Sequence, residues 1–162
     1  MAQVDYFLEL ESVKGESKDA KMANKIQLES WSWGESNSGT HGSGGGGGGG
    51  KVVMQDFHFA KKVDAASPNL MLACAEGRHI KTGQLTSRKA GKDQQEFLVF
   101  KFYDLLVSSY SIGGSGNADV VPVDQFAVNF AKIEWAYKPQ KADGTLDSAV
   151  KGGWDTNTNK KV

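Results

Sequence analysis

Apolar side chains occupy every second position over several stretches of the chain. Residues 4–10 show this first, with Tyr6 and Leu8 on the same side as Val4, and a period of two is typical of a strand that buries one face. The pattern recurs over residues 26–34, 52–60, 96–103, 105–112 and 126–137. Residues 79–90 are mostly polar and are interpreted as an exposed strand. The chain is therefore predicted to be mainly β.

Two of these stretches change the side that their apolar residues occupy. In the first, Ile26 begins one face, whereas Trp31 and Trp33 occupy the other. Ser30 and Ser32 are left on the face that Ile26 begins. Such a switch, which residues 126–137 repeat, indicates a bulge or a strand whose two faces meet different surroundings. The tryptophans then fit two interpretations, core packing and a surface between subunits.

One short helix is predicted near the middle of the chain. Ser67 suits the N-cap and Pro68 suits the first helical position, while Gly77 can end the helix in the left-handed region. The residues between them are mostly apolar, so the helix is expected to span about 68–76 and to be largely buried, with Cys74 as a small buried hydrophobe.

Many strands, turn residues at fairly regular spacing and a single helix predict a β-barrel or two-sheet sandwich with one short flanking α-helix. With 162 residues, the chain suits one domain, 1–162, that is large enough for a core of its own. Within it, the glycine-rich residues 36–50 are expected to form an extended loop. Residues 155–162 are expected to form a flexible tail.

Charge and cysteine content exclude several classes of function. Lys and Arg total 19, as do Asp and Glu, and a neutral chain is a poor candidate for binding nucleic acid. A single cysteine allows no internal disulfide, which fits folding in a reducing compartment. The N-terminus lacks the features of a secretory signal. No stretch approaches the roughly 18 apolar residues of a membrane span, so no membrane insertion is expected.

The glycine run superficially resembles a nucleotide-binding loop. Gly45, Gly50 and Lys51 match the spacing of a P-loop, but Val52 stands where the motif needs Ser or Thr to place a hydroxyl on Mg²⁺. The residues after Lys51 also look like a strand, whereas a P-loop opens a helix. A flexible loop is the preferred interpretation.

Candidate catalytic and metal-binding residues are sparse. His41, His58 and His79 are 17 and 21 residues apart, and none has a partner at metal-ligand spacing. No Ser/His/Asp order can be argued from the spacing. The prediction is a protein that is not an enzyme and that needs neither a cofactor nor a metal.

Several blocks of the chain form a pattern that can be recognised. One is Ser30-Trp31-Ser32-Trp33-Gly34, and another is Ser67-Pro68-Asn69-Leu70-Met71. The remaining blocks are residues 13–19, 41–52, 55–56, 73–74, 88–91, 107–109, 113–116, 129–131 and 137–144. In these blocks, which follow one another over essentially the whole chain, the sequence resembles the Hcp (haemolysin-coregulated protein) family of bacterial type VI secretion.

The resemblance implies a β-barrel that assembles as a hexameric ring. Stacked rings form the hollow inner tube of a contractile apparatus, with spike, sheath and baseplate proteins as further partners and small effector proteins in the lumen. It also implies a protein that is cytoplasmic before firing and is then secreted without a signal peptide.

Two groups of residues are expected to carry this function. Ser30, Ser32 and Ser115 are small and polar, and we expect them to face the lumen and contact cargo. The glycine-rich loop 36–50, which we call the arm, is expected to dock on the neighbouring ring. Its contact residues are expected to be Ser38, Gly39, Thr40, His41, Gly42, Gly44, Gly47 and Gly50. Ordering such an arm costs about 1–2 kcal/mol for each residue fixed, so stacking is expected to be weak until a partner nucleates it.

Three alternatives remain at this point. The chain is either a ring-shaped effector carrier that does not stack extensively by itself, or a secreted toxin, or a sandwich-type binding module. The family's toxins carry catalytic C-terminal extensions, and the chain is expected to end where the barrel ends. A binding module outside the cell needs an export signal, which the N-terminus does not show.

Overall fold

The computed structural model describes residues 3–39, 50–89, 91, 93–117 and 121–162. Strands predominate, and α1 spans Ser67–Glu76. The strands are β1 (Val4–Leu10), β2 (Ile26–Leu28), β3 (Ser30–Ser32), β4 (Glu35–Asn37), β5 (Val52–Met54), β6 (Phe57–Lys62), β7 (Ile80–Lys89), β8 (Glu96–Gly113), β9 (Val123–Tyr137), β10 (Val150–Asp155) and β11 (Lys160–Lys161). The prediction of a mainly β chain with one helix is confirmed.

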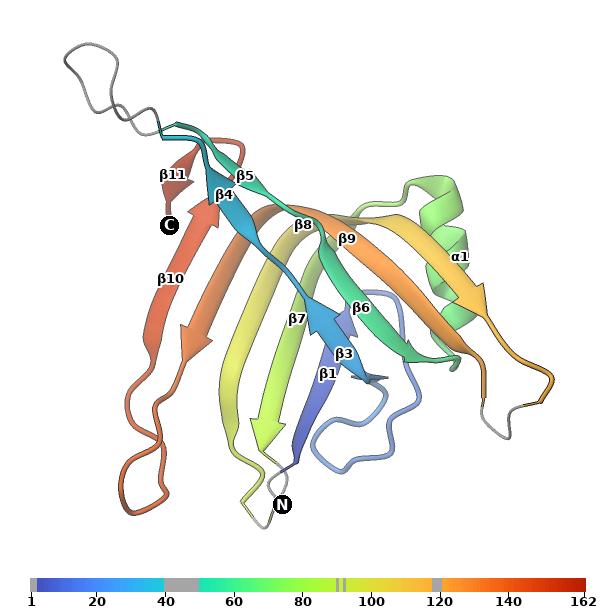
Figure 1. Cartoon of the computed structure of the whole chain (residues 1–162), viewed down its shortest axis with the longest axis horizontal. Helices are drawn as coiled ribbons and strands as arrows, with labels where there is room; N and C mark the ends of the chain where they lie inside the picture. Colours follow the sequence, from blue (N-terminus) through green and yellow to red (C-terminus); the bar gives the residue numbers. More distant parts are fainter. Residues whose placement is uncertain (1–2, 40–49, 90, 92, 118–120) are drawn as a thin grey trace.

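The main sheet has the order β11-β10-β9-β8-β7-β1-β2, and β6 also pairs with β9 and with β3. In the described part of the chain this ladder does not close into a complete barrel. The segment 26–32 nevertheless links the β2 end of this sheet to the β3–β6 branch on β9, because β2 pairs with β1 while β3 pairs with β6. β4 and β5 form a separate ribbon that crosses one end of the sheet (Figure 1).

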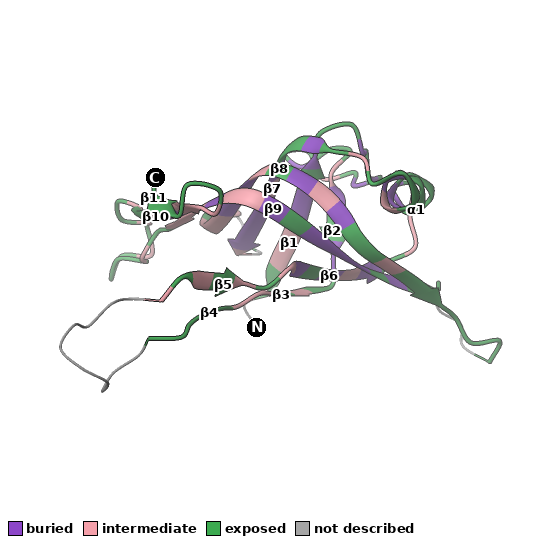
Figure 2. Cartoon of the chain, turned by 90° about the horizontal axis from the view of Figure 1, so that it is seen from above, coloured by how far each residue is buried: buried purple, intermediate pink, exposed green. Residues whose placement is uncertain are grey.

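Two layers are visible from above (Figure 2). β3, β6 and the β4–β5 ribbon form one layer, and the long strands β7, β8 and β9 cross in the other. α1 and the arm base lie toward opposite ends of the molecule. The described strand β5 begins at Val52, so Lys51 leads into a strand and not into the helix that a P-loop requires.

Aromatic rings fill the space between the layers. Phe57 contacts five other rings of this core, with centroids 5.3 Å from Phe59 and Phe100, 4.9 Å from Phe102, 5.5 Å from Trp31 and 5.8 Å from Trp33. Phe57 is fully buried. Stacked and edge-to-face pairs at these distances add to the free energy of burial.

The switches of face have local structural causes. β2 ends at Leu28 and β3 begins at Ser30, and the N–H of Glu29 between them donates to the carbonyl of Ala60. In β8, Asp104 adopts a positive φ of 55°, and the β8–β9 register shifts further along the strand, between Val107 and Ser109. Apolar residues are buried at even positions before Asp104 and at odd positions after it. The strand therefore turns its apolar side over at Asp104, without a shift in its pairing with β9 at that point.

α1 differs from its prediction in two ways. Ala66 holds the N-cap position and makes no side-chain cap, because the hydroxyl of Ser67 is used in a buried network described below. The helix is also less buried than expected, since Met71 is 40% and Leu72 49% exposed and Cys74 is only half-buried. Gly77 does end the helix at a φ of 60°, as predicted.

The expectation of an exposed strand over residues 79–90 is wrong. The stretch from Leu85 to Arg88 is buried. Arg88 is 1% exposed because Asp19 accepts two hydrogen bonds from its guanidinium at 3.0 and 2.7 Å. The loop that carries Asp19 covers a strand whose polar sequence suggested solvent.

The C-terminal residues pair where a flexible tail was expected. Lys161 and Lys160 of β11 pair with Trp154 and Asp155 of β10. The carboxylate of Asp155 accepts the N–H groups of Asn157 and Thr158. This turn holds the last residues against the sheet edge.

Candidate functional site

Small polar side chains cover the outer side of β3, β6, β9 and β8. The register aligns them in two rows that cross the four strands. One row is Ser30, Ala60, Gln125 and Ser111, and the other is Ser32, His58, Ala127 and Ser109. Most of these residues line a shallow groove of about 260 Å³. We call these eight residues the polar face.

Strand alternation explains why this face is polar. Trp31 points to the other side of β3 and packs on Phe57 of the core, which leaves Ser30 and Ser32 exposed. Phe57 and Phe59 likewise point inward from β6, so His58 between them is exposed. The structure therefore brings two of the predicted lumen residues, Ser30 and Ser32, into one groove.

The third predicted lumen residue, Ser115, lies elsewhere. It follows the end of β8 at Gly113 and is exposed at the tip of the β8–β9 hairpin. The groove includes instead Ser109 and Ser111 of the same strand. Both side chains stand on the groove's face because β8 shifts register after Val107.

A hydrogen-bonded cluster around the carboxylate of Asp56 lies beside the polar face. The sequence patterns did not predict it. Asp56 accepts hydrogen bonds from Ser108 at 2.7 Å and from Asn129 at 2.9 Å. Asn129 shares a strand face with Gln125, so the cluster borders the groove. The sequence offered one indication of this cluster, because all three residues lie in separate blocks of the family resemblance.

The arm leaves the molecule from the β4–β5 ribbon. Ser36 and Asn37, expected within a loop, pair in β4 with Val53 and Val52, so the hairpin extends further than predicted. The amide of Asn37 donates to the carbonyl of Gly50 at 2.7 Å. A Cβ on Gly50 would lie 2.5 Å from the carbonyl of Ser38, so only glycine fits there.

Only part of the predicted arm can be placed. Ser38 and Gly39 are exposed, and Gly50 is half-buried at the base. The expected arm residues Thr40, His41, Gly42, Gly44 and Gly47 lie outside the described residues.

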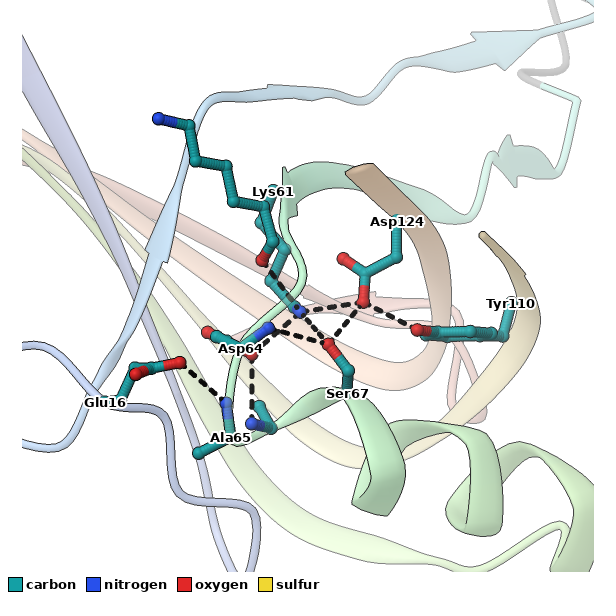
Figure 3. A network of polar contacts seen from close by, with 9 residues as sticks. Glu16, Lys61, Asp64, Ala65, Ser67, Tyr110 and Asp124 are labelled. Carbon is teal, nitrogen blue, oxygen red and sulfur yellow. Dashed lines mark hydrogen bonds and ion pairs between the residues drawn. The ribbon is translucent and has the colours of Figure 1, made fainter. Parts of the chain in front are cut away.

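Behind the polar face lies a buried network of charged residues (Figure 3). The ammonium of Lys61 donates to Asp124 and Ser67 at 2.8 Å and to Asp64 at 2.9 Å. Tyr110 donates to the same oxygen of Asp124 at 2.6 Å. Burial, followed by this hydrogen bond, raises the pKa of Tyr110 to about 12. The network joins β6, β8 and β9 to the start of α1.

This network resembles a Ser/Lys catalytic pair only in its distances. Lys61 is 0% and Ser67 1% exposed, so a substrate has no access to either. Lys61 is also held between two carboxylates, with which it forms ion pairs at 2.9 Å (Asp64) and 2.8 Å (Asp124). We interpret the network as the anchor of α1.

The described residues contain neither a metal-binding cluster nor a helix that could span a membrane. No group of three or more His, Cys, Asp or Glu side chains there is arranged to hold a metal ion. Within the same ranges, no helix has the length and apolar character needed to span a membrane.

Comparison with known proteins agrees with the fold. Residues 7–137 match the family model described as "Type VI secretion system effector, Hcp". The chain is 48% identical over 158 residues to Protein hcp1 of Pseudomonas aeruginosa, covering 96% of this chain and 97% of that protein.

Solved structures superimpose over nearly the full length. A type six secretion system protein matches with a TM-score of 0.93 and 30% identity, covering 99% of this chain and 100% of the other. Hcp1 from Salmonella typhimurium matches with a TM-score of 0.79 and 30% identity over the whole of both chains. Taken with the arm, the polar face and the mainly β fold, these matches show that the chain belongs to the Hcp family of type VI secretion proteins.

Proposed function

We propose that this chain is the subunit of the hollow inner tube of a type VI secretion system. Six copies form a ring, the rings stack, and the lumen carries and protects small effector proteins. The subunits are cytoplasmic until firing, which sends the tube out of the cell without a signal peptide. Spike, sheath and baseplate proteins are the further partners. The observation that carries this proposal is the polar face, which provides the wall of such a lumen.

The chemistry of the polar face suits varied cargo. Its side chains are mostly hydroxyl and amide groups that donate or accept hydrogen bonds, and Ala60 and Ala127 add no bulk. The exposed Ser30, Ser32 and Ser109 offer such contacts without steric demand. Unlike an apolar pocket, a face of this kind does not select one shape of partner.

The arm supports the proposal of stacking. β4 is exposed along its whole length and pairs only with β5 among the described strands. A two-stranded ribbon is marginally stable alone and gains from docking on another surface. Because fixing each residue of such an arm costs about 1–2 kcal/mol, stacking is weak unless a partner starts it.

The lumen assignment is tested by enlarging the polar face. Ser32→Gln and Ser32→Arg place a larger side chain in the groove without touching the core on the other side of β3. We expect intact rings that retain less of a co-expressed effector, measured by co-purification. Ser148→Gln, at an exposed serine outside the groove, is the control. Undiminished retention by both Ser32 variants would exclude this face from the cargo site.

The ordering cost of the arm also favours a second candidate, a ring that carries effectors without stacking extensively by itself. Negative-stain images of the purified chain separate the two. Long tubes at micromolar protein support autonomous stacking, whereas single rings support the carrier. A chain that stays monomeric at that concentration contradicts both.

A further inference from the structure

One carboxylate beside the polar face is oriented by neutral neighbours. Asp56 directly precedes β6 and lies on its outer side, since Phe57 after it points into the core. Its Oδ2 accepts a hydrogen bond from the hydroxyl of Ser108 at 2.7 Å, and its Oδ1 accepts one from the amide of Asn129 at 2.9 Å. No ion pair joins Asp56 to a lysine, arginine or histidine in the part of the chain that the structure describes.

A β-bulge supplies one of the two donors. The β8–β9 register shifts between Val107 and Ser109, which makes Ser108 the extra residue of β8. Bulges re-aim side chains and are frequent beside functional sites. Here the bulge leaves the hydroxyl of Ser108 within hydrogen-bonding distance of Asp56, while Asn129 reaches the same carboxylate from β9. Contacts from two strands therefore fix the plane of this carboxylate.

Cations neutralise the more deeply buried carboxylates of the fold. Arg88 is paired with Asp19, and Lys61 is paired with two further carboxylates. The donors that orient Asp56 are uncharged and leave its negative charge in place. A carboxylate offers about four lone-pair sites, two on each oxygen. Each oxygen of Asp56 therefore keeps one acceptor site for a cation from outside the chain.

The surroundings of Asp56 contain little other charge. The polar face consists of serine, alanine, glutamine and histidine, without Asp, Glu, Lys or Arg. Asn129, which holds Asp56, shares the exposed side of β9 with Gln125 of the polar face. The next lysine or arginine on the outer side of β6 is Lys62, about 20 Å away along an extended strand. The border of the polar face at Asp56 is therefore negative.

We propose that Asp56 binds an arginine side chain of the cargo protein. Because this contact lies in the proposed lumen, it rests on the proposed function and names the chemistry that the lumen wall selects. A guanidinium donates two parallel hydrogen bonds to a carboxylate whose oxygens lie in one fixed plane. Ser108 and Asn129 hold the oxygens in that way. The compact ammonium of a lysine gains less from such orientation.

A ring multiplies this contact. Six copies place six Asp56 carboxylates around one lumen, so a cargo protein with several arginines can bind more than one of them. A single exposed ion pair is weak, but linked pairs strengthen one another through effective concentration. The hydroxyl and amide groups of the polar face remain tolerant of shape. Selection by arginine therefore suits cargo proteins of different folds.

The test uses three dye-labelled peptides that differ in one kind of residue. Each alternates glycine with arginine, lysine or citrulline, where citrulline keeps the shape of arginine without its charge. Fluorescence anisotropy at low salt measures their Kd for the native chain and for Asp56→Asn, which keeps the size of the side chain. The native chain is expected to bind the arginine peptide tightest and the citrulline peptide weakest. Asp56→Asn is expected to weaken binding of the arginine peptide by about fivefold or more.

A second variant separates orientation from charge. Ser108→Ala with Asn129→Ala removes both donors and keeps the carboxylate, and both residues are exposed, so the fold is retained. This variant is expected to bind the arginine and lysine peptides equally, because the plane of the carboxylate is no longer fixed. Asp93→Asn, at an exposed carboxylate outside the polar face, removes the same charge and is expected to leave all three Kd values unchanged.

Two results overturn the arginine contact and leave the proposed ring standing. One is an arginine-peptide Kd that Asp56→Asn does not change, and the other is equal binding of the arginine and citrulline peptides by the native chain. Shorter stacks of Asp56→Asn rings in negative-stain images, with unchanged peptide binding, assign the cation to a second copy and also overturn the cargo contact.

Failure of the proposed function is measured separately. Size-exclusion chromatography with light scattering reports whether the native chain forms rings, and a chain that stays monomeric contradicts the proposed function. The three residues of the Asp56 cluster belong to one chain, so the peptide Kd values decide whether Asp56 selects arginine in either case. The two failures are therefore distinguishable.

Discussion

The two sides of β3 and β6 show how one pair of strands serves two purposes. Inward, Trp31 stacks on Phe57 at 5.5 Å, and Phe57 on Phe59 at 5.3 Å. Outward, Ser32 and His58 stand opposite each other and are exposed. The inner side contributes stability because its rings are desolvated and densely packed. The outer side contributes little stability, so its side chains can be used for contact with a partner protein.

The largest loss of stability is expected on the inner side. Phe57→Ala is expected to lower the free energy of unfolding by about 4 kcal/mol, because it removes a fully buried ring and leaves a cavity. Urea unfolding followed by tryptophan fluorescence measures it. A loss below about 1 kcal/mol, typical of surface positions, would contradict the packing described here.

The inner side of β6 is not wholly apolar. Lys61 follows Phe57 and Phe59 on the same face and is fully buried. Lys61→Met leaves Asp64 and Asp124 without their cation, and the expected cost is about 3 kcal/mol.

A double variant separates this charge effect from packing. Adding Asp124→Leu to Lys61→Met removes an uncompensated buried charge. We expect the double variant to regain part of the loss in a double-mutant cycle. Strict additivity of the two single effects would show that the two residues do not interact.

A smaller loss of stability is expected from the ion pair between Arg88 of β7 and Asp19 of the loop that covers it. The Arg88 guanidinium, through its hydrogen bonds, holds the pKa of the Asp19 carboxyl well below the ordinary 3.8. Because the folded-state pKa lies below the unfolded one, the pair stabilises the fold fully above the unfolded pKa. That contribution is lost as the pH falls through the folded pKa.

Asp19→Asn is therefore expected to lower stability at neutral pH and to flatten the decline in stability between about pH 5 and pH 2. Urea midpoints measured across this range test it. Asp93→Asn, at an exposed carboxylate, is the control. An unchanged pH profile in Asp19→Asn would contradict the role of the ion pair.

The smallest effect is expected on the outer side of β3. Ser32→Ala removes an exposed hydroxyl that no core contact uses, and it should change the free energy of unfolding by no more than about 0.5 kcal/mol. Thermal unfolding measures it beside Phe57→Ala. A destabilisation as large as that of Phe57→Ala would show that the two sides of the strand are not independent.

Local patterns predicted most of the elements. The alternation in β1 and the interruption at Glu29 follow from residues close in sequence, as does the bend at Asp104, because a strand's face is decided every two residues. The same holds for the end of α1 at Gly77. The candidate site was predictable in part, since Ser30 and Ser32 follow from the switch of face.

The predictions that the structure corrects depend on contacts between segments that are distant in sequence. Arg88 looked exposed because its own strand is polar, yet Asp19, far away in sequence, covers it. Asp56, Ser108 and Asn129 come from three strands, and no spacing indicates that they meet. α1 looked buried because its residues are apolar, but the sheet covers only one side of the helix.

The sequence by itself determined the strands, the single helix and the family, because period, turn residues and motif order are properties of the chain. The tertiary structure decided which polar residues are buried and which strands combine into the polar face. It also decided that Ser115 stands apart from Ser30 and Ser32. Burial and convergence depend on the neighbours that folding supplies, and those neighbours lie outside any local pattern.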